Sequence, residues 1–183
     1  MAQLTLAGIP RSGGRTASEP EYVDQGATFD PERVYRYRLW RTWERTHPRV
    51  LFVMCNPSTA DEHKLDPTLR RCLGFARAWG CGGFDVANIF SLRSTDPKKL
   101  YEVEDPVGPN NDHHLAALAA AAHMVIAAWG CHGELMRRAA CVECLLAKHQ
   151  DLHVLKLTKD GYPGHPLYLS AAAQPVLFRA RGA

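Results

Sequence analysis

The sequence has no apolar run that approaches the roughly 20 residues needed to span a bilayer. Its first residues, MAQLTLAGIPRSGG, contain neither a basic leader nor the apolar stretch of a signal peptide. A strong charge imbalance is also missing, because the net charge is only +3. These absences predict a cytoplasmic protein with no membrane segment, and the charge alone does not indicate a polyanionic partner.

Closely spaced pairs of metal ligands are scarce. Cys141 and Cys144 form a C-x-x-C pair, but the other four cysteines offer no second close pair. We expect both residues on the apolar stripe of a helix, and all six cysteines as reduced thiols. The neighbours His113 and His114 should diverge on a helix, which disfavours a shared metal ion. The sequence therefore predicts no metal site and no cofactor.

What the chain does contain is enough apolar sequence for one domain. Of its 183 residues, 46% are hydrophobic and 22% are charged, values typical of a globular protein. Residues 1–30 are rich in Gly, Pro, Ser and Thr and predict an irregular N-terminal arm. Residues 31–183 are expected to form a single domain, which we expect to be monomeric.

Hydrophobic periodicity predicts an alternation of strands and helices. Residues 33–42 alternate as a half-exposed strand should, with Arg36 and Arg38 on the same face. Residues 50–55 are apolar on both faces, as in a central strand covered by helices. Further strands are expected at residues 84–90, 124–130 and 152–157, and helices at 66–80, 115–123 and 134–149. The prediction is a three-layer α/β/α fold with a central, mostly parallel four-stranded sheet and residues 33–42 added antiparallel at an edge.

Polar or special residues follow each predicted central strand. Asn56-Pro57-Ser58-Thr59 comes after the first, Asn88 ends the second, Trp129-Gly130 ends the third, and TKDGYPGHPLYLS (158–170) follows the fourth. In open α/β sheets, ligands bind beyond the carboxyl ends of the strands. The sequence therefore predicts one binding or catalytic site built from these segments.

These segments resemble the motifs of the uracil-DNA glycosylase superfamily. Asn56-Pro57 is similar to the G-x-N-P-G motif of its mismatch-specific branch, with Met54-Cys55 in place of the glycine. The run VANIFSLRST resembles the strand that carries the superfamily's base-reading asparagine, here Asn88. HPLYLS (165–170) resembles HPSPLS and departs from it at Leu167 and Tyr168. The resemblance implies a uracil-DNA-glycosylase-like fold and hydrolysis of an N-glycosidic bond in DNA.

The resemblance also assigns roles to individual residues. Asn56 would hold the attacking water and His165 would stabilise negative charge on the departing base. Asn88 would read the base edge, with Phe90 or Tyr168 stacking on the base. Contacts to DNA would come from Ser58, Thr59, Arg70, Arg71, Arg93 and the wedge residue Leu169.

The chain resembles a second group more closely, an uncharacterised bacterial and phage domain family. Its motifs are NPSTAD, DPT-x-RR, DPVGP followed by N and D, and TKDG-x-P-x-HPLYL, all of which occur here. These motifs add five polar residues to the candidate site: Asp61, Asp66, Asp105, Asp112 and Lys159. The resemblance does not imply an activity, because a fold or family does not settle chemistry.

Two other functions remain open at this point. The polar residues after the strands could bind a free nucleotide or a modified base without DNA glycosylase activity. The chain could also be a nucleic-acid-binding module without catalysis. Salt dependence would separate these alternatives, since binding to DNA phosphates weakens steeply with added salt.

Overall fold

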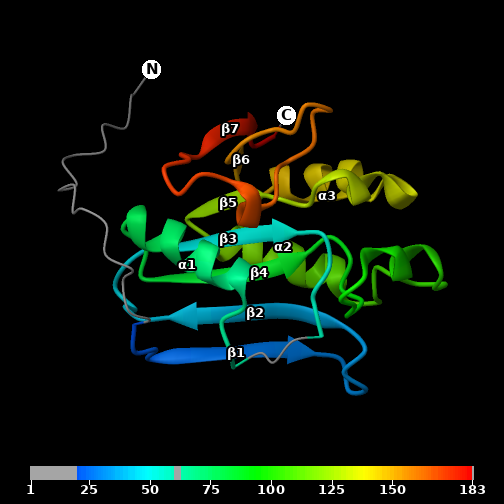
Figure 1. The fold of residues 1–183 in the computed structure, drawn as a ribbon, viewed down its shortest axis with the longest axis horizontal. Coiled ribbons are helices and arrows are strands. Elements are labelled where there is room, and N and C mark those ends of the chain that lie inside the picture. Colours follow the sequence, from blue (N-terminus) through cyan, green and yellow to red (C-terminus); the bar gives the residue numbers. More distant parts are fainter. Residues whose placement is uncertain (1–19, 60–62, 183) are drawn as a thin grey trace.

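The computed structural model describes residues 20–59 and 63–182 of the chain. They form an α/β fold around a seven-stranded sheet with the order β1-β2-β4-β3-β5-β6-β7 (Figure 1). The strands are β1 (Asp24–Phe29), β2 (Arg36–Thr42), β3 (Arg49–Met54), β4 (Gly83–Asn88), β5 (Met124–Ala127), β6 (Leu152–Val154) and β7 (Val176–Arg179). The α-helices are α1 (Pro67–Ala78), α2 (Asn111–Ala121) and α3 (Arg138–Ala147), and the 3₁₀ helices are η1 (Pro97–Tyr101), η2 (Cys131–Arg137) and η3 (Pro166–Tyr168).

The sheet is mixed. Strand β3 pairs in parallel with β4 and β5, and β5 pairs in parallel with β6. The β1–β2, β2–β4 and β6–β7 pairs are antiparallel. The α/β fold class is confirmed, and the sheet is larger than the predicted four strands, because antiparallel strands extend it at both ends. The strand predicted at residues 33–42 joins the parallel strands in antiparallel orientation, as expected, but β1 covers its outer side and forms the edge of the sheet.

Part of the predicted N-terminal arm is ordered as a strand. Residues 1–19 lie outside the described residues, but Asp24–Phe29 forms β1 and pairs with β2 from Asp24 opposite Thr42. Its hydrogen bonds to β2 come from the backbone, so its sequence carries little of the alternation that predicts strands. The boundary between arm and domain therefore falls before residue 24 rather than at residue 30.

Strand β2 contains an irregularity that changes which face its arginines use. Thr28 lies opposite Arg38 and Phe29 lies opposite Arg36, so Tyr37 is an extra residue in β2. Such a β-bulge re-aims the side chains on either side of it. Arg36 and Arg38 consequently line two different cavities. The prediction that they share one half-exposed face is wrong, and most of β2 is buried.

Helices cover both faces of the sheet. Helix α1 packs with Val50, Phe52 and Phe84 on one face. Helices α2 and α3 pack with Leu51 and Val53 on the other. Because β3 contributes to both clusters, the prediction of a strand buried on both sides is confirmed. None of the helices in the described part of the chain combines the length and apolar character of a membrane-spanning segment.

Helix α1 has the boundaries that its sequence predicts. Asp66 is the N-cap, and its Oδ1 accepts a hydrogen bond of 2.7 Å from Leu69 N–H. Pro67 follows at the first helical position, where its missing N–H costs nothing. The predicted third helix at 134–149 is instead broken, because Met136 and Arg137 have positive φ angles of 56° and 53°.

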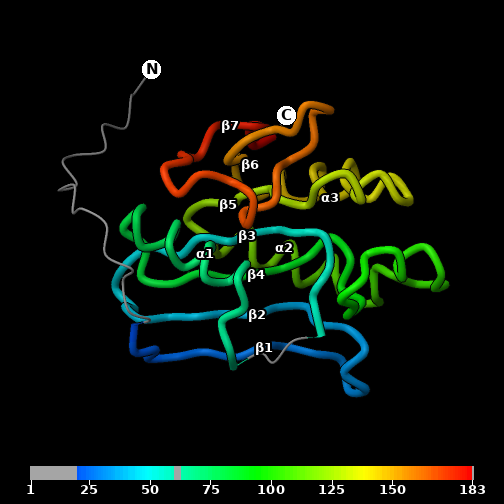
Figure 2. The backbone as a smooth tube through the Cα atoms, in the orientation of Figure 1, coloured from blue at the N-terminus to red at the C-terminus, as the bar shows by residue number. Residues whose placement is uncertain are grey.

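The segment between β6 and β7 returns across the sheet to reach helix α1. The turn at Thr158–Tyr162 is closed by hydrogen bonds of 2.8 Å from Thr158 N and 3.0 Å from Gly161 N. The chain then continues into η3, which packs against α1 (Figure 2). This return brings residues 165–168 beside the ends of strands that lie about a hundred positions earlier in sequence.

Candidate functional site

A cavity of about 360 Å³ opens at the carboxyl ends of the parallel strands. Its lining includes Asn56 after β3, Asn88 at the end of β4, and His165 in the loop before η3. Small-molecule sites commonly have volumes of about 300–1,000 Å³. The three residues that the sequence predicts to converge therefore do line one cavity.

Backbone contacts fix the position of Asn56 and of its loop. The Asn56 Nδ2 donates to the carbonyl oxygen of Ser94 over 2.8 Å. Ser94 N–H in turn donates to the Pro57 carbonyl oxygen over 2.9 Å. Since the amide nitrogen is occupied by Ser94, the Oδ1 of Asn56 is the atom left to accept a hydrogen bond from a ligand or water.

Asn88 is held from behind by the start of helix α2. Its backbone carbonyl oxygen accepts a hydrogen bond of 3.0 Å from Asn111 Nδ2, which also donates to the Ile89 carbonyl over 3.0 Å. Arg138 donates from Nε to the same Ile89 carbonyl over 2.7 Å. Asn88 is only 2% exposed, and its side-chain amide makes no hydrogen bond within the described residues. The donor and acceptor of this amide are therefore available to a ligand.

The local structure sets the protonation state of His165. Its Nδ1 accepts a hydrogen bond of 3.3 Å from Leu167 N–H, so the proton of the neutral ring lies on Nε2. Burial lowers the pKa of His165, and the nearby carboxylate of Asp66 opposes that shift only in part. His165 is consequently a neutral hydrogen-bond donor near pH 7.

Arg71 of α1 anchors the loop that carries His165. Its guanidinium donates to the Pro166 carbonyl oxygen over 3.5 Å and also hydrogen-bonds the Leu169 carbonyl. Tyr168 lies at the mouth of the cavity with 82% of its surface exposed, and its ring centroid is 5.8 Å from that of His165. A rigid imidazole thus lies beside an exposed aromatic ring that can stack on a flat ligand.

Six of the predicted site residues line this cavity: Asn56, Ser58, Asp66, Asn88, His165 and Tyr168. The carboxyl group of Asp66 lies at the cavity and also caps α1, so it has a structural role as well. Ser58 is half-buried in the loop after β3. Together with the three central residues they provide both donors and acceptors around one space.

Other predicted site residues have different places. Phe90 is fully buried in the core, and Leu169 packs against the core beside α1, so neither is free to stack on or wedge into DNA. Arg71 and Arg93 donate to backbone carbonyl oxygens, in the case of Arg93 those of Arg33 and Thr59. Thr59 and Arg70 are exposed outside the cavity lining.

The remaining family-motif residues are structural or distant. Asp105 Oδ1 accepts hydrogen bonds from Val107 N–H and Gly108 N–H and so closes a turn. Asp112 forms an ion pair with Arg138, and Lys159 lies exposed in the Thr158–Tyr162 turn. Asp61 lies outside the described residues.

Several cavity residues were not predicted. They include Arg36, Thr68 and His132, from β2, α1 and η2 respectively. Thr68 stands next to the Asp66-Pro67 cap in the DPT motif, so that motif was a usable signal. His132 lies just beyond Gly130, in a strand-end loop. Arg36 reaches the cavity only because of the bulge at Tyr37, which the sequence pattern does not reveal.

Two cysteines also line the cavity. Cys55 is largely buried, and this burial raises the pKa of its thiol to about 12. Cys131 lies nearby and is exposed. A thiol that stays protonated at pH 7 is a poor nucleophile, so Cys55 contributes shape and apolar surface rather than covalent chemistry.

The cysteines of helix α3 do not behave as predicted. Both Cys141 and Cys144 are exposed rather than part of the apolar stripe, because the buried face of α3 is formed by Arg138, Val142, Leu146 and Ala147. Within residues 20–59 and 63–182, no cluster of three potential metal-ligating side chains occurs.

The family model described as a protein of unknown function, DUF1643, matches residues 36–167. The chain belongs to the DUF1643 family. The matched segment runs from Arg36 in β2 to Leu167 in η3, so it includes Asn56, Asn88 and His165. Searches of the curated proteins and of the solved structures gave no match.

Proposed function

We propose that this DUF1643 chain recognises a nucleobase, in the manner of the uracil-DNA glycosylase superfamily. The observation that carries the proposal is the shared cavity of Asn56, Asn88 and His165 at the carboxyl ends of neighbouring strands. In this proposal the parallel strands β4, β3, β5 and β6 correspond to the superfamily's core. The three residues would then stand where that superfamily carries its motifs, after the first, second and last of its strands.

Asn88 is the base-reading residue in this proposal. Its amide offers a donor beside an acceptor, which matches the adjacent carbonyl and imide N–H of uracil. Because Asn88 is only 2% exposed, a base that does not pair with its amide leaves buried polar groups unsatisfied. Such groups discriminate between bases more strongly than apolar contacts do.

His165 stabilises the charge that develops on the departing base. Its Nε2–H points away from the Nδ1 that accepts from Leu167, so a neutral imidazole can donate to a pyrimidine carbonyl oxygen. A preorganised donor of this kind contributes roughly 3 kcal/mol to the transition state in comparable oxyanion sites.

Asn56 orients the attacking water through Oδ1 but cannot remove its proton. General-base catalysis typically contributes about 10²–10⁴-fold, so the hydrolysis we propose is slow. Asp66 is the nearest carboxylate in the lining, yet one of its oxygens is used to cap α1. The concrete version of the proposal is a slow N-glycosylase acting on uracil or another damaged or mismatched base in DNA.

One observation favours a second function. Arg71 and Arg93, two of the arginines expected at DNA phosphates, hydrogen-bond to the protein's own backbone. The proposed contacts to DNA are then reduced to Ser58, Thr59 and Arg70. A free nucleobase or modified nucleotide needs no such surface, so binding of a small ligand in the same cavity is the alternative.

The test is incubation of the protein with labelled oligonucleotides that carry uracil, other deaminated bases or mismatches, followed by alkaline cleavage. Cleavage should appear on at least one substrate and fall at least tenfold in the His165→Ala and Asn88→Ala variants. His123→Ala is the matched control, because His123 is exposed and does not line the cavity. Cleavage that persists in both cavity variants would rule out the assigned residues.

Binding measurements separate the alternatives if no cleavage occurs. Free uracil should bind the wild type and lose affinity in Asn88→Ala, with little response to added salt, if the ligand is small. Binding to an oligonucleotide that weakens steeply with salt would instead indicate a nucleic-acid-binding module. Absence of both kinds of binding would contradict a nucleobase function.

A further inference from the structure

A second cavity, of about 390 Å³, lies on the other side of the molecule from α1, between α2 and strands β1 to β4. Its polar lining consists of Thr28, Arg38, Arg49, Asp85 and His114. None of these residues lines the first cavity. The glycosylase-like proposal therefore gives this space no role.

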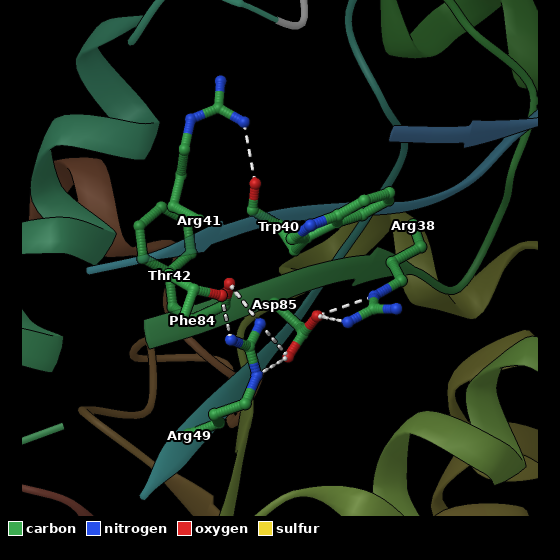
Figure 3. A network of polar contacts seen from close by, with 7 residues as sticks. All are labelled: Arg38, Trp40, Arg41, Thr42, Arg49, Phe84 and Asp85. Atoms are coloured by element: carbon green, nitrogen blue, oxygen red, sulfur yellow. Dashed lines mark hydrogen bonds and ion pairs between the residues drawn. The ribbon is translucent and has the colours of Figure 1, made fainter. Parts of the chain in front are cut away.

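A network of charged side chains forms the floor of the second cavity. Asp85 on β4 lies between the guanidinium groups of Arg38 on β2 and Arg49 on β3 (Figure 3). The distance from Arg38 Nη2 to Asp85 Oδ1 is 2.7 Å, and from Arg49 Nη2 to Asp85 Oδ2 it is 2.8 Å. Two positive charges thus share one negative charge, and each carboxylate oxygen is already engaged by a guanidinium.

The two arginines differ in the donors that they retain. Arg49 also donates to Thr42 and, over 3.3 Å, to the Phe84 carbonyl oxygen, so most of its N–H groups are used. Arg38 donates only to Asp85 among the described residues. Its guanidinium lies 4.6 Å from the ring centroid of Trp40, and its side chain is 33% exposed. Arg38 is therefore held in place from two sides while part of its planar fork faces the cavity.

The opposite wall is largely apolar. It is formed by side chains from α2 and its end: Ala117, Leu118, Ala121 and Ala122. His114 completes the wall, and its ring stacks on Tyr37 with centroids 4.6 Å apart and planes 11° apart. Burial lowers the pKa of His114, so it does not add a charge at neutral pH. The lining thus combines one uncompensated positive charge with an apolar surface.

We propose that the second cavity binds a small organic anion. A phosphate or carboxylate group of the ligand pairs with the guanidinium of Arg38, and the apolar part of the ligand packs on the alanine-rich face of α2. An oxyanion can accept from the N–H groups of the Arg38 guanidinium that Asp85 does not occupy, in a charge-assisted hydrogen bond. The volume of the cavity leaves room for a ring beside the charged group.

The direct test is isothermal titration calorimetry with phenyl phosphate, benzoate and neutral benzyl alcohol. At least one anion should bind, benzyl alcohol should not, and the stronger of the two anions identifies the head group. Arg38→Gln should weaken binding at least tenfold, while Arg181→Gln, an exposed arginine outside the cavity, should leave it unchanged. Binding of neither anion, or equal binding by Arg38→Gln and wild type, would overturn the proposal.

A second pair of variants leaves the ion pairs of Asp85 with Arg38 and Arg49 in place. Ala117 is exposed on α2 and lines the cavity, whereas Ala120 is exposed on the same helix and does not. Ala117→Glu places a carboxylate beside Arg38, so it should abolish anion binding and raise the melting temperature. Ala120→Glu should do neither, because it introduces the same glutamate on the same helix but outside the cavity. If the two variants bind the anion equally well, the site is not this cavity.

Discussion

The side-chain amide of Asn56 donates from Nδ2 to the carbonyl oxygen of Ser94, 2.8 Å away. This contact ties the start of the loop after β3 to the loop after β4. It also decides which atom of Asn56 faces the cavity, because an amide with its nitrogen occupied presents its oxygen.

Asn56→Asp is expected to destabilise the protein more than Asn56→Ala. The aspartate replaces the donor with a second acceptor and places a negative charge beside the Ser94 carbonyl, whereas alanine only removes the hydrogen bond. The cost of an unsatisfied buried partner is about 1–3 kcal/mol, which urea unfolding can measure. An Asn56→Asp variant as stable as the wild type would show that the hydrogen bond to Ser94 contributes little to stability.

The lowered pKa of His165 gives the protein a pH dependence of stability. In the unfolded chain histidine takes up a proton near pH 6.5, but burial lowers the pKa in the folded state. Between these two values the unfolded chain binds more protons, so the free energy of unfolding falls as the pH drops below about 6.5. Urea titrations from pH 7.5 to 4.5 should show a weaker fall in His165→Asn, whose side-chain oxygen can replace Nδ1 as the acceptor for Leu167.

Asp85→Asn should lower the free energy of unfolding by about 3 kcal/mol, because it leaves two guanidinium groups facing each other without a counter-charge. The matched control is Glu102→Gln, which breaks an exposed ion pair with Lys99 and should cost less than about 1 kcal/mol. Equal effects in urea unfolding would mean that the buried network contributes no more than a surface pair.

The six cysteines should divide into two groups of three under native conditions. Cys55, Cys72 and Cys81 are shielded, and burial raises the pKa of Cys55 to about 12 and of Cys81 to about 11. Cys131, Cys141 and Cys144 are exposed. Iodoacetamide at pH 8 should therefore add three groups to the folded protein and six to the unfolded protein, as counted by mass spectrometry. Rapid labelling of Cys55 would contradict the burial assigned to its thiol.

Asn111→Ala should weaken ligand binding at the first cavity, although Asn111 does not line it. Asn111 is fully buried and donates to the carbonyl oxygens of Asn88 and Ile89, so its loss leaves two buried acceptors unsatisfied at a cost of about 1–3 kcal/mol. Asn111→Asp should cost more, since it replaces the donor with a charge. If Asn111→Ala unfolds like the wild type in urea, the support it gives to Asn88 is negligible.

The elements with local signals could be predicted from the sequence. Helix α1 begins at the Asp66-Pro67 pair because the cap and the first-turn proline act within one turn of the chain. The convergence of Asn56, Asn88 and His165 could also be predicted, since loops after parallel strands meet at one edge of the sheet.

The errors arise where distant contacts decide the structure. Strands β1 and β7 lie at the two ends of the sheet and are held by backbone pairing, and Val176 and Leu177 of β7 are more than half exposed. Residues 134–149 follow a helical pattern, yet positive φ angles at Met136 and Arg137 interrupt it. The sequence gives no notice of such a break, because neither residue is a glycine.

The extra residue at Tyr37 has a consequence for how this protein can change. With strict alternation, Arg36 and Arg38 would lie on the same side of the sheet, and only one of the two cavities would receive this pair of side chains. The single extra residue instead places these two neighbouring cations in separate cavities. Deleting Tyr37 would therefore disturb both cavities at once, although they share no lining residue.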